Sequence, residues 1–265
     1  MNKIICIGVG TLIVVAAFIG FAFWPTNPGK VAVPTAPPQA VVSPASIPVS
    51  GPVEQRNVFT YQGKTMSYLL SLPAGYSRGT QVWPMLVFLH GSSLRGNDLD
   101  LVKRYGPSRA AAEQANFPLI VLSPQCPEGE AWSDAEGLAA LVAAVSKKHR
   151  VDPDRVYLAG MSLGGSGVWH LASQHPEYFA AVAPVAACRT VTEAGAKRLA
   201  SLPIWAIHGE KDTVCPIKNS ERTIQYLRTL GNAPRFTVLP DKGHYITEVF
   251  ANREFYDWLL THKRK

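Results

Sequence analysis

The sequence contains little cysteine, few charged residues and no internal repeat. Four cysteines in 265 residues are too few for a small domain held together by disulfides. None of them is spaced with histidines as structural zinc requires, so we expect no metal ion and no other cofactor. Apolar residues make up 47% of the chain, which excludes wholesale disorder, and the 21 glycines follow no collagen-like period.

The charge of the chain is mildly basic, with 26 Lys and Arg against 19 Asp and Glu and a net charge of +7. The basic residues are scattered, except for a short cluster in residues 262–265 at the end. Such a short cluster favours a solvated tail over a nucleic-acid-binding patch, which would need basic residues gathered on one face. We therefore predict no nucleic-acid partner.

An uncharged apolar segment occupies residues 4–24, directly after Lys3. A helix of about 20 apolar residues spans the hydrocarbon core of a bilayer. We expect an uncleaved transmembrane anchor, with Lys3 inside the cytoplasm and the rest of the chain outside. The alternative is a signal peptide cleaved near Gly20 and Ala22, which would release the chain into the same compartment.

Proline is concentrated in residues 25–52, where Lys30 is the only charged residue. Proline removes backbone donors and favours extended polyproline conformations, so this segment is typical of a stiff, unpacked spacer. The sequence thus divides into a membrane segment or signal peptide at residues 1–24, a linker at 25–52 and a folded domain at 53–265.

Short apolar runs alternate with helical patterns throughout the folded domain. Runs with apolar residues on both faces are typical of strands inside a covered parallel sheet. Two strands around a turn at Gln62 and Gly63 open the domain as an antiparallel pair. We expect strands at residues 57–61, 66–70, 85–89, 119–122, 156–159, 180–185, 204–207 and 235–239.

Apolar residues recurring every three or four positions predict helices at 133–149 and 164–174, a helix that ends at Gly231, and a last helix through Phe250 and Leu259. This alternation predicts an α/β fold with a doubly wound, mostly parallel sheet of about eight strands. In such sheets, functional sites lie beyond the carboxyl ends of the strands.

One of these strand ends carries the pattern Gly160-Met161-Ser162-Leu163-Gly164, between the strand at 156–159 and the helix that follows. A nucleophile at the tip of so sharp a turn is exposed only if the backbones beside it crowd together, which glycine permits. The helix directs its free N–H groups toward charge that develops on a substrate. Ser162 is therefore the predicted nucleophile.

A serine hydroxyl needs a base to accept its proton. His244 lies in a loop after the last predicted strand, at the edge of the sheet where Ser162 is expected. His90 and His208 each end a strand before a glycine, a position that usually supports a loop, although His90 could line the site. We predict His244 as the general base.

The base in turn needs an acid that holds its tautomer. The loop after the strand at 204–207 offers Glu210 and Asp212, and Asp212 lies far enough into the loop to turn back over the sheet. We favour Asp212, with Glu210 as the alternative. The order Ser162, Asp212, His244 along the chain is the nucleophile–acid–histidine order of one large fold group.

Four segments carry a resemblance to a known family: residues 89–98, 160–165, 208–212 and 243–244. With them, residues 53–265 resemble an α/β-hydrolase, and more closely the carboxylesterases of the polyhydroxybutyrate-depolymerase-like, feruloyl-esterase-like and dienelactone-hydrolase-like kind. The resemblance implies the α/β-hydrolase fold and a Ser-His-Asp triad. It also implies an oxyanion hole made by the backbone N–H groups of Leu163 and Ser92, with Ser93 as the alternative to Ser92.

The segment between the strand at 180–185 and the next helix, near Thr192, is short, whereas many relatives insert a helical cap there. We therefore expect no large cap domain and an open cleft that admits bulky or polymeric esters. The candidate wall residues of this cleft are Leu94, Arg95, Trp132 and Tyr245. Trp132 could equally be a core aromatic residue, and Arg95 is more typical of a solvated loop.

Three cysteines lie in loops after strands. Cys188 and Cys215 follow neighbouring strands near the predicted acid, so we predict a disulfide between them, with Cys126 free. The alternative is three reduced thiols.

The combined prediction is a membrane-anchored serine esterase that acts outside the cytoplasm, or a secreted one if the first segment is cleaved. Its expected partners are a small-molecule or polymeric ester and the membrane, and no oligomeric state follows from the sequence. The alternatives are a serine peptidase of related fold and a non-catalytic binding module on a hydrolase scaffold.

Overall fold

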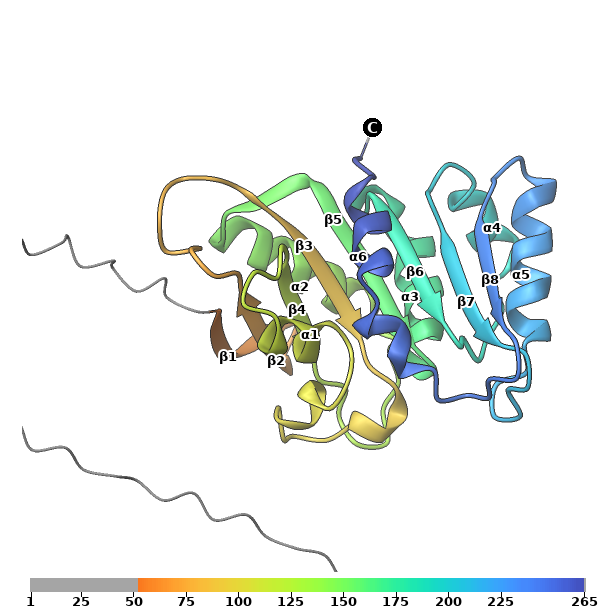
Figure 1. Cartoon of the computed structure of the whole chain (residues 1–265), viewed down its shortest axis with the longest axis horizontal. Coiled ribbons are helices and arrows are strands. Elements are labelled where there is room, and N and C mark those ends of the chain that lie inside the picture. Colours follow the sequence, from red (N-terminus) through yellow and green to blue (C-terminus); the bar gives the residue numbers. More distant parts are fainter. Residues whose placement is uncertain (1–51, 265) are drawn as a thin grey trace, which may run out of the picture. The chain divides into compact units, whose positions relative to one another are not determined.

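One eight-stranded sheet organises the computed structural model, which describes residues 52–264 (Figure 1). The strand order is β1-β2-β4-β3-β5-β6-β7-β8. Strands β3 to β8 run parallel, and β1 and β2 form an antiparallel hairpin whose second strand pairs antiparallel with β4. The strands are β1 (Val53–Tyr61), β2 (Lys64–Leu72), β3 (Trp83–Leu89), β4 (Ile120–Pro124), β5 (Val151–Met161), β6 (Ala181–Val185), β7 (Trp205–Gly209) and β8 (Arg235–Leu239).

Helices cover both faces of the sheet, as its two-sided apolar strands require. One core joins a face of the sheet to α2 (Ala135–Lys148), α3 (Leu163–Gln174), α4 (Glu193–Arg198) and α5 (Lys218–Thr229). The other core joins the opposite face to α1 (Pro107–Glu113), to a 3₁₀ helix at Thr247–Ala251 and to α6 (Arg253–Leu260). In Figure 1, α1 and α6 lie in front of the sheet.

The predicted element types are observed, and their bounds differ at the ends. The predicted last helix is divided in two at Asn252, whose side chain accepts a hydrogen bond from the N–H of Glu254 and so begins α6 anew. The strand predicted at 156–159 is longer, because β5 begins at Val151. The short helix α1, which begins after Gly106 with Pro107 in its first turn, was not predicted.

The predicted segment 1–24 and residues 25–51 of the predicted linker lie outside the described residues. In residues 52–264 no helix is long and apolar enough to cross a membrane.

Candidate active site

Ser162 lies at the turn between β5 and α3, with φ of 59° and ψ of −116°. Its N–H donates to the carbonyl of Val185 at 2.9 Å, which ties the turn to the neighbouring strand β6. Residues other than glycine rarely adopt a positive φ, so the surrounding packing must hold Ser162 in this conformation. The turn raises the Ser162 side chain beyond the carboxyl end of the sheet.

Two glycines make this sharp turn possible. A Cβ on Gly160 would lie 2.5 Å from the carbonyl oxygen of Gly164, and a Cβ on Gly164 would overlap the carbonyl oxygen of Leu89. Helix α3 therefore begins in direct contact with the end of β3, a packing that only glycine allows.

Three side chains from three strand ends meet at this edge. The Oγ of Ser162 lies 2.8 Å from Nε2 of His244, and Nδ1 of His244 lies 2.7 Å from Oδ2 of Asp212. The side chains of His244 and Asp212 are almost fully buried. Glu210, the alternative acid, is exposed and instead accepts a weak hydrogen bond from the N–H of Asp241 at 3.4 Å.

The carboxylate of Asp212 is satisfied on both oxygens. Its Oδ1 accepts from the backbone N–H groups of Val214 at 2.9 Å and Cys215 at 2.8 Å, while Oδ2 faces His244. Burial acts to raise the pKa of Asp212, but the hydrogen bonds from His244 and these backbone groups outweigh it and hold the pKa below its usual range. Asp212 therefore remains ionised near neutral pH.

A second histidine supports the same carboxylate. His208 is fully buried, and its Nε2 donates to the carbonyl of Cys215 at 2.8 Å and lies 3.2 Å from Oδ2 of Asp212. Its Nδ1 lies 2.8 Å from the hydroxyl of Ser220. His208 thus fixes the loop that carries Asp212, as its place at a strand end suggested.

The loop after β3 faces the nucleophile. A Cβ on Gly91 would lie 3.4 Å from the Cβ of Ser162, so the backbone that leads into Ser92 passes close to the nucleophile. Ser92 and Leu163 are the first residues of a 3₁₀ helix and of α3, where backbone N–H groups have no partner within the helix. Among the hydrogen bonds of residues 52–264, none uses either of these two donors.

Two side chains hold that loop, the buried His90 and the partly buried Tyr105. Burial lowers the pKa of His90 to about 4, so its neutral ring accepts the N–H of Cys126 through Nε2 at 3.1 Å. Tyr105 accepts the N–H of Gly91 through its hydroxyl at 2.7 Å. Tyr105 was not singled out from the sequence, because nothing near it in the chain indicates this distant contact.

Cys188 and Cys215 form a disulfide across 27 positions, and Cys126 is a free, buried thiol. The Sγ of Cys188 lies 3.7 Å from the Oγ of Ser162, and the N–H of Cys215 bonds to Asp212. The disulfide therefore links the surroundings of the nucleophile to the loop of the acid.

Residues 109–255, more than half of the chain, match the model of the phospholipase/carboxylesterase family. The chain belongs to this family. The sequence of "Putative esterase NocK" from Nocardia uniformis subsp. tsuyamanensis is 30% identical over 70% of this chain and 59% of its own length. The bifunctional acetylxylan esterase/xylanase XynS20E from Neocallimastix patriciarum is 26% identical over 66% of this chain and 26% of its length.

Solved structures agree with membership of the phospholipase/carboxylesterase family. A thermostable esterase superposes with a TM-score of 0.72 at 26% identity, over 80% of this chain and 63% of that chain. A feruloyl esterase module from Clostridium thermocellum superposes with a TM-score of 0.61 at 15% identity. The superposition covers 79% of this chain and 87% of the module's chain, and at this identity it shows the fold alone. The fold is thus that of the α/β-hydrolases, and the chain spans less than two thirds of the two curated relatives and of the thermostable esterase.

The four residues predicted to line the cleft differ in how exposed their side chains are. Tyr245 is 78% exposed, and its ring lies edge-on to that of His244, with the ring centroids 5.5 Å apart. Leu94 and Trp132 are buried, and the indole N–H of Trp132 donates to the carbonyl of His90 at 2.9 Å. Arg95 is half-buried, close enough for its charge to act on His90.

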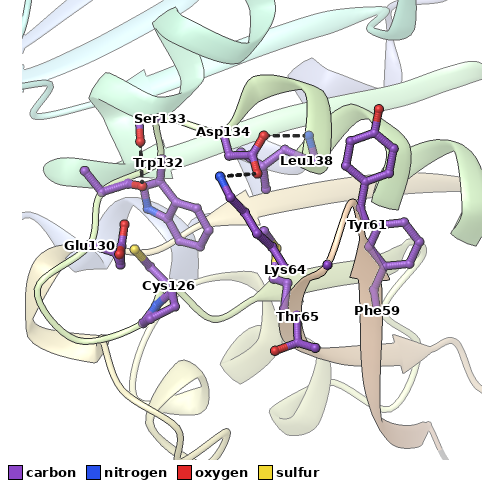
Figure 2. Close-up of a pocket in the computed structure, with 15 residues that line it drawn as sticks. Phe59, Tyr61, Lys64, Thr65, Cys126, Glu130, Trp132, Ser133, Asp134 and Leu138 are labelled. Carbon is purple, nitrogen blue, oxygen red and sulfur yellow. Dashed lines mark hydrogen bonds and ion pairs between the residues drawn. The ribbon is translucent and has the colours of Figure 1, made fainter.

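Two hollows lie beside the loop that precedes α2. The first, of about 450 Å³, lies between the β1–β2 turn and the loop that precedes α2 (Figure 2). The second, of about 420 Å³, is lined by α3, including Leu163, and by the loop from Arg189 to Thr192. Residues 131–133 line both hollows, so this loop borders each of them.

Within residues 52–264, no group of His, Cys, Asp or Glu side chains is arranged to hold a metal ion. What the arrangement offers chemically is a hydroxyl, a base within hydrogen-bonding distance of it, and two unused backbone donors in the adjoining backbone.

Proposed function

We propose that this protein is a serine hydrolase that cleaves carboxylic esters, with Ser162 as nucleophile, His244 as general base and Asp212 as the acid that orients it. The observation that carries the proposal is the continuous line of hydrogen bonds, 2.8 Å from Ser162 to His244 and 2.7 Å from His244 to Asp212. Membership of the phospholipase/carboxylesterase family supports the choice of ester over amide substrates.

In the first step, the Oγ of Ser162 attacks the ester carbonyl while its proton passes to Nε2 of His244. The negative charge on the carbonyl oxygen is stabilised by the N–H groups of Leu163 and Ser92. The protonated His244 then donates its proton to the leaving alcohol, and an acyl-enzyme remains on Ser162. Asp212, held ionised by its own partners, stabilises the imidazolium throughout.

In the second step, water replaces the alcohol. His244 takes a proton from the water as it attacks the acyl carbonyl, and then gives that proton to the Oγ of Ser162 as the acyl–oxygen bond breaks, which releases the carboxylic acid and restores Ser162. The disulfide between Cys188 and Cys215 keeps the acid loop in place and fits an oxidising compartment. Together with the apolar segment 4–24, it supports action outside the cytoplasm, with residues 53–265 as the catalytic domain, 25–52 as its linker and 1–24 as the anchor.

The test is a comparison of Ser162→Ala with the wild-type protein, using a fluorophosphonate label and p-nitrophenyl acetate. We expect the variant to lose labelling and its kcat to fall by about 10⁶-fold, since the nucleophile is removed. Ser92→Ala is the matched control, because it removes a nearby exposed hydroxyl and keeps the backbone N–H. A wild-type protein that neither reacts with the label nor hydrolyses the ester would contradict the proposal and favour a non-catalytic binding role.

A further inference from the structure

The loop that carries the N–H of Ser92 has little packing of its own. Ser92 and Ser93 are exposed, and they belong to a 3₁₀ helix of three residues without a side-chain cap. This short helix is anchored at its end by Leu94, which is buried and whose carbonyl accepts from the side-chain amide of Gln125 at 3.1 Å. The position of the Ser92 N–H therefore depends on how the start of the helix, at Gly91, is held.

Gly91 is held by the phenol of Tyr105. The hydroxyl oxygen of Tyr105 accepts the N–H of Gly91 at 2.7 Å. A Cβ on Gly91 would lie 2.9 Å from this oxygen and 3.4 Å from the Cβ of Ser162, so the phenol and the nucleophile both lie next to this one residue. The side chain of Ser93 also interacts with the phenol and acts to lower the pKa of Tyr105, although burial outweighs this effect and raises the pKa. An un-ionised phenol therefore interacts with the residues before and after Ser92.

Tyr105 is itself fixed against the sheet. Its ring packs edge-on against Phe88 of β3, with the ring centroids 6.2 Å apart. The next residue, Gly106, has φ of 88°, and a Cβ there would lie 2.5 Å from the ring of Phe88. Only glycine allows the segment of Tyr105 to approach the strand so closely. The hydroxyl of Tyr105 is thus a fixed point that sets the loop after β3.

We propose that Tyr105 is a positioning residue of the oxyanion hole, which sets the N–H of Ser92 at the place where negative charge develops on the ester carbonyl. The inference rests on the proposed ester hydrolysis at Ser162. A backbone donor stabilises an oxyanion best when it is already in place and does not have to move during the reaction. Because this charge develops only as the reaction proceeds, loss of the phenol hydroxyl should lower kcat and leave KM nearly unchanged.

The experiment is Tyr105→Phe, which keeps the ring on Phe88 and removes the acceptor of the Gly91 N–H. With p-nitrophenyl acetate we expect kcat to fall by about tenfold and KM to stay within about twofold of the wild-type value. This loss is smaller than the 10²–10³-fold, on the order expected when an oxyanion donor is removed, because the donor is displaced and not deleted. A kcat at the wild-type value, or a loss that appears in KM alone, would overturn the inference.

Tyr157→Phe is the matched control. Tyr157 is fully buried in β5, and its hydroxyl bonds to a backbone group, the carbonyl of His262, at 2.9 Å. The variant therefore also loses one phenol hydroxyl that bonds to the backbone, and it should keep the wild-type kcat. An equal fall of kcat in Tyr157→Phe and Tyr105→Phe would show a general effect of losing such a hydroxyl and would overturn the positioning role.

The double variant Tyr105→Phe, Ser92→Pro distinguishes positioning from any independent effect of Tyr105. Ser92→Pro removes the donor, so that Tyr105→Phe should lower kcat by less than about twofold in this background. Losses that multiply in the double variant would overturn the inference, because Tyr105 would then act independently of the N–H of Ser92.

Failure of the proposed hydrolysis would appear separately, as no turnover of p-nitrophenyl acetate by the wild-type protein. The role of Tyr105 would then be decided by amide hydrogen exchange, since its hydroxyl is the acceptor of the Gly91 N–H. Faster exchange at Gly91 in Tyr105→Phe than in Tyr157→Phe would support a phenol that holds this loop, and equal exchange would overturn it.

Discussion

Ser162 holds a left-handed backbone conformation, with φ of 59°, at the end of β5. Such a conformation in a residue other than glycine costs on the order of 1–3 kcal/mol. The hydrogen bond from its N–H to Val185 and the contact of Gly164 with Leu89 hold the turn in this state. Because of this conformation, the hydroxyl of Ser162 faces His244 and lies beside the first N–H groups of α3.

The backbone donor at Ser92 can be removed with little disturbance to the fold. Ser92 is the first residue of its 3₁₀ helix, where proline is favoured, and Gly91 before it is extended, as a residue before proline should be. We predict that Ser92→Pro lowers kcat on p-nitrophenyl acetate by about 10²–10³-fold, because the oxyanion loses one donor. Steady-state kinetics, with circular dichroism to verify folding, measures this effect.

The matched variant Ser92→Ala keeps the donor and should retain the wild-type kcat. If Ser92→Pro is folded and as active as the wild-type protein, the second oxyanion donor lies elsewhere, with the N–H of Ser93 as the next candidate.

The loops after β7 and β8 form the other half of the site. A Cβ on Gly209 would lie 2.6 Å from the carbonyl oxygen of Lys242, so the two loops pass in direct contact. This contact brings Asp212 and His244 together although 32 positions separate them. The disulfide from Cys215 to Cys188 adds a covalent link from the first of these loops to the loop after β6.

We predict that the double variant Cys188→Ser, Cys215→Ser unfolds with a free energy lower by about 3.5 kcal/mol, because the disulfide closes a loop of 27 positions in the unfolded chain. Its kcat should also fall, since the N–H of Cys215 helps to hold Asp212. Urea unfolding and steady-state kinetics at a temperature where both proteins are folded provide the two measurements.

Treatment of the wild-type protein with dithiothreitol should reproduce both losses. Cys126→Ala is the control: it should lose stability on reduction as the wild-type protein does, because Cys126 takes no part in the bridge. An unfolding midpoint that reduction leaves unchanged would count against a stabilising disulfide.

At the scale of the whole molecule, we predict that the segment at 1–24 anchors the chain and that residues 53–265 carry the activity. The full chain should stay with the membrane fraction after washing in alkaline carbonate, since its apolar segment at 4–24 is long enough to span a bilayer. Residues 53–265 produced alone should be found in the soluble fraction with kcat unchanged.

N-terminal sequencing of the full-length product distinguishes the alternatives. A mature chain that begins near Phe23 would show that the segment is a cleaved signal peptide. A shortened chain that folds but has lost its activity would contradict the assignment of catalysis to residues 53–265.

The sequence alone determined the parts of this protein that depend on local patterns. All eight strands were predicted near their observed positions, because an apolar run between turn residues identifies a strand from a short stretch of sequence. Ser162 was singled out from the glycines around it, and the phospholipase/carboxylesterase family assignment agrees with the resemblance drawn from four short motifs. The meeting of Ser162, Asp212 and His244 follows from their shared position at the carboxyl ends of parallel strands.

Only the tertiary structure decided what surrounds these residues. Burial of Leu94 and Trp132, the contact of His208 with Asp212 and the hollow between Tyr61 and Trp132 all depend on packing between segments far apart in the chain. A local pattern gives the face on which a side chain lies, whereas its neighbours across a loop are set by how distant elements pack together. For that reason the reaction type could be inferred from the residues themselves, and the surroundings of Ser162 only from the folded chain.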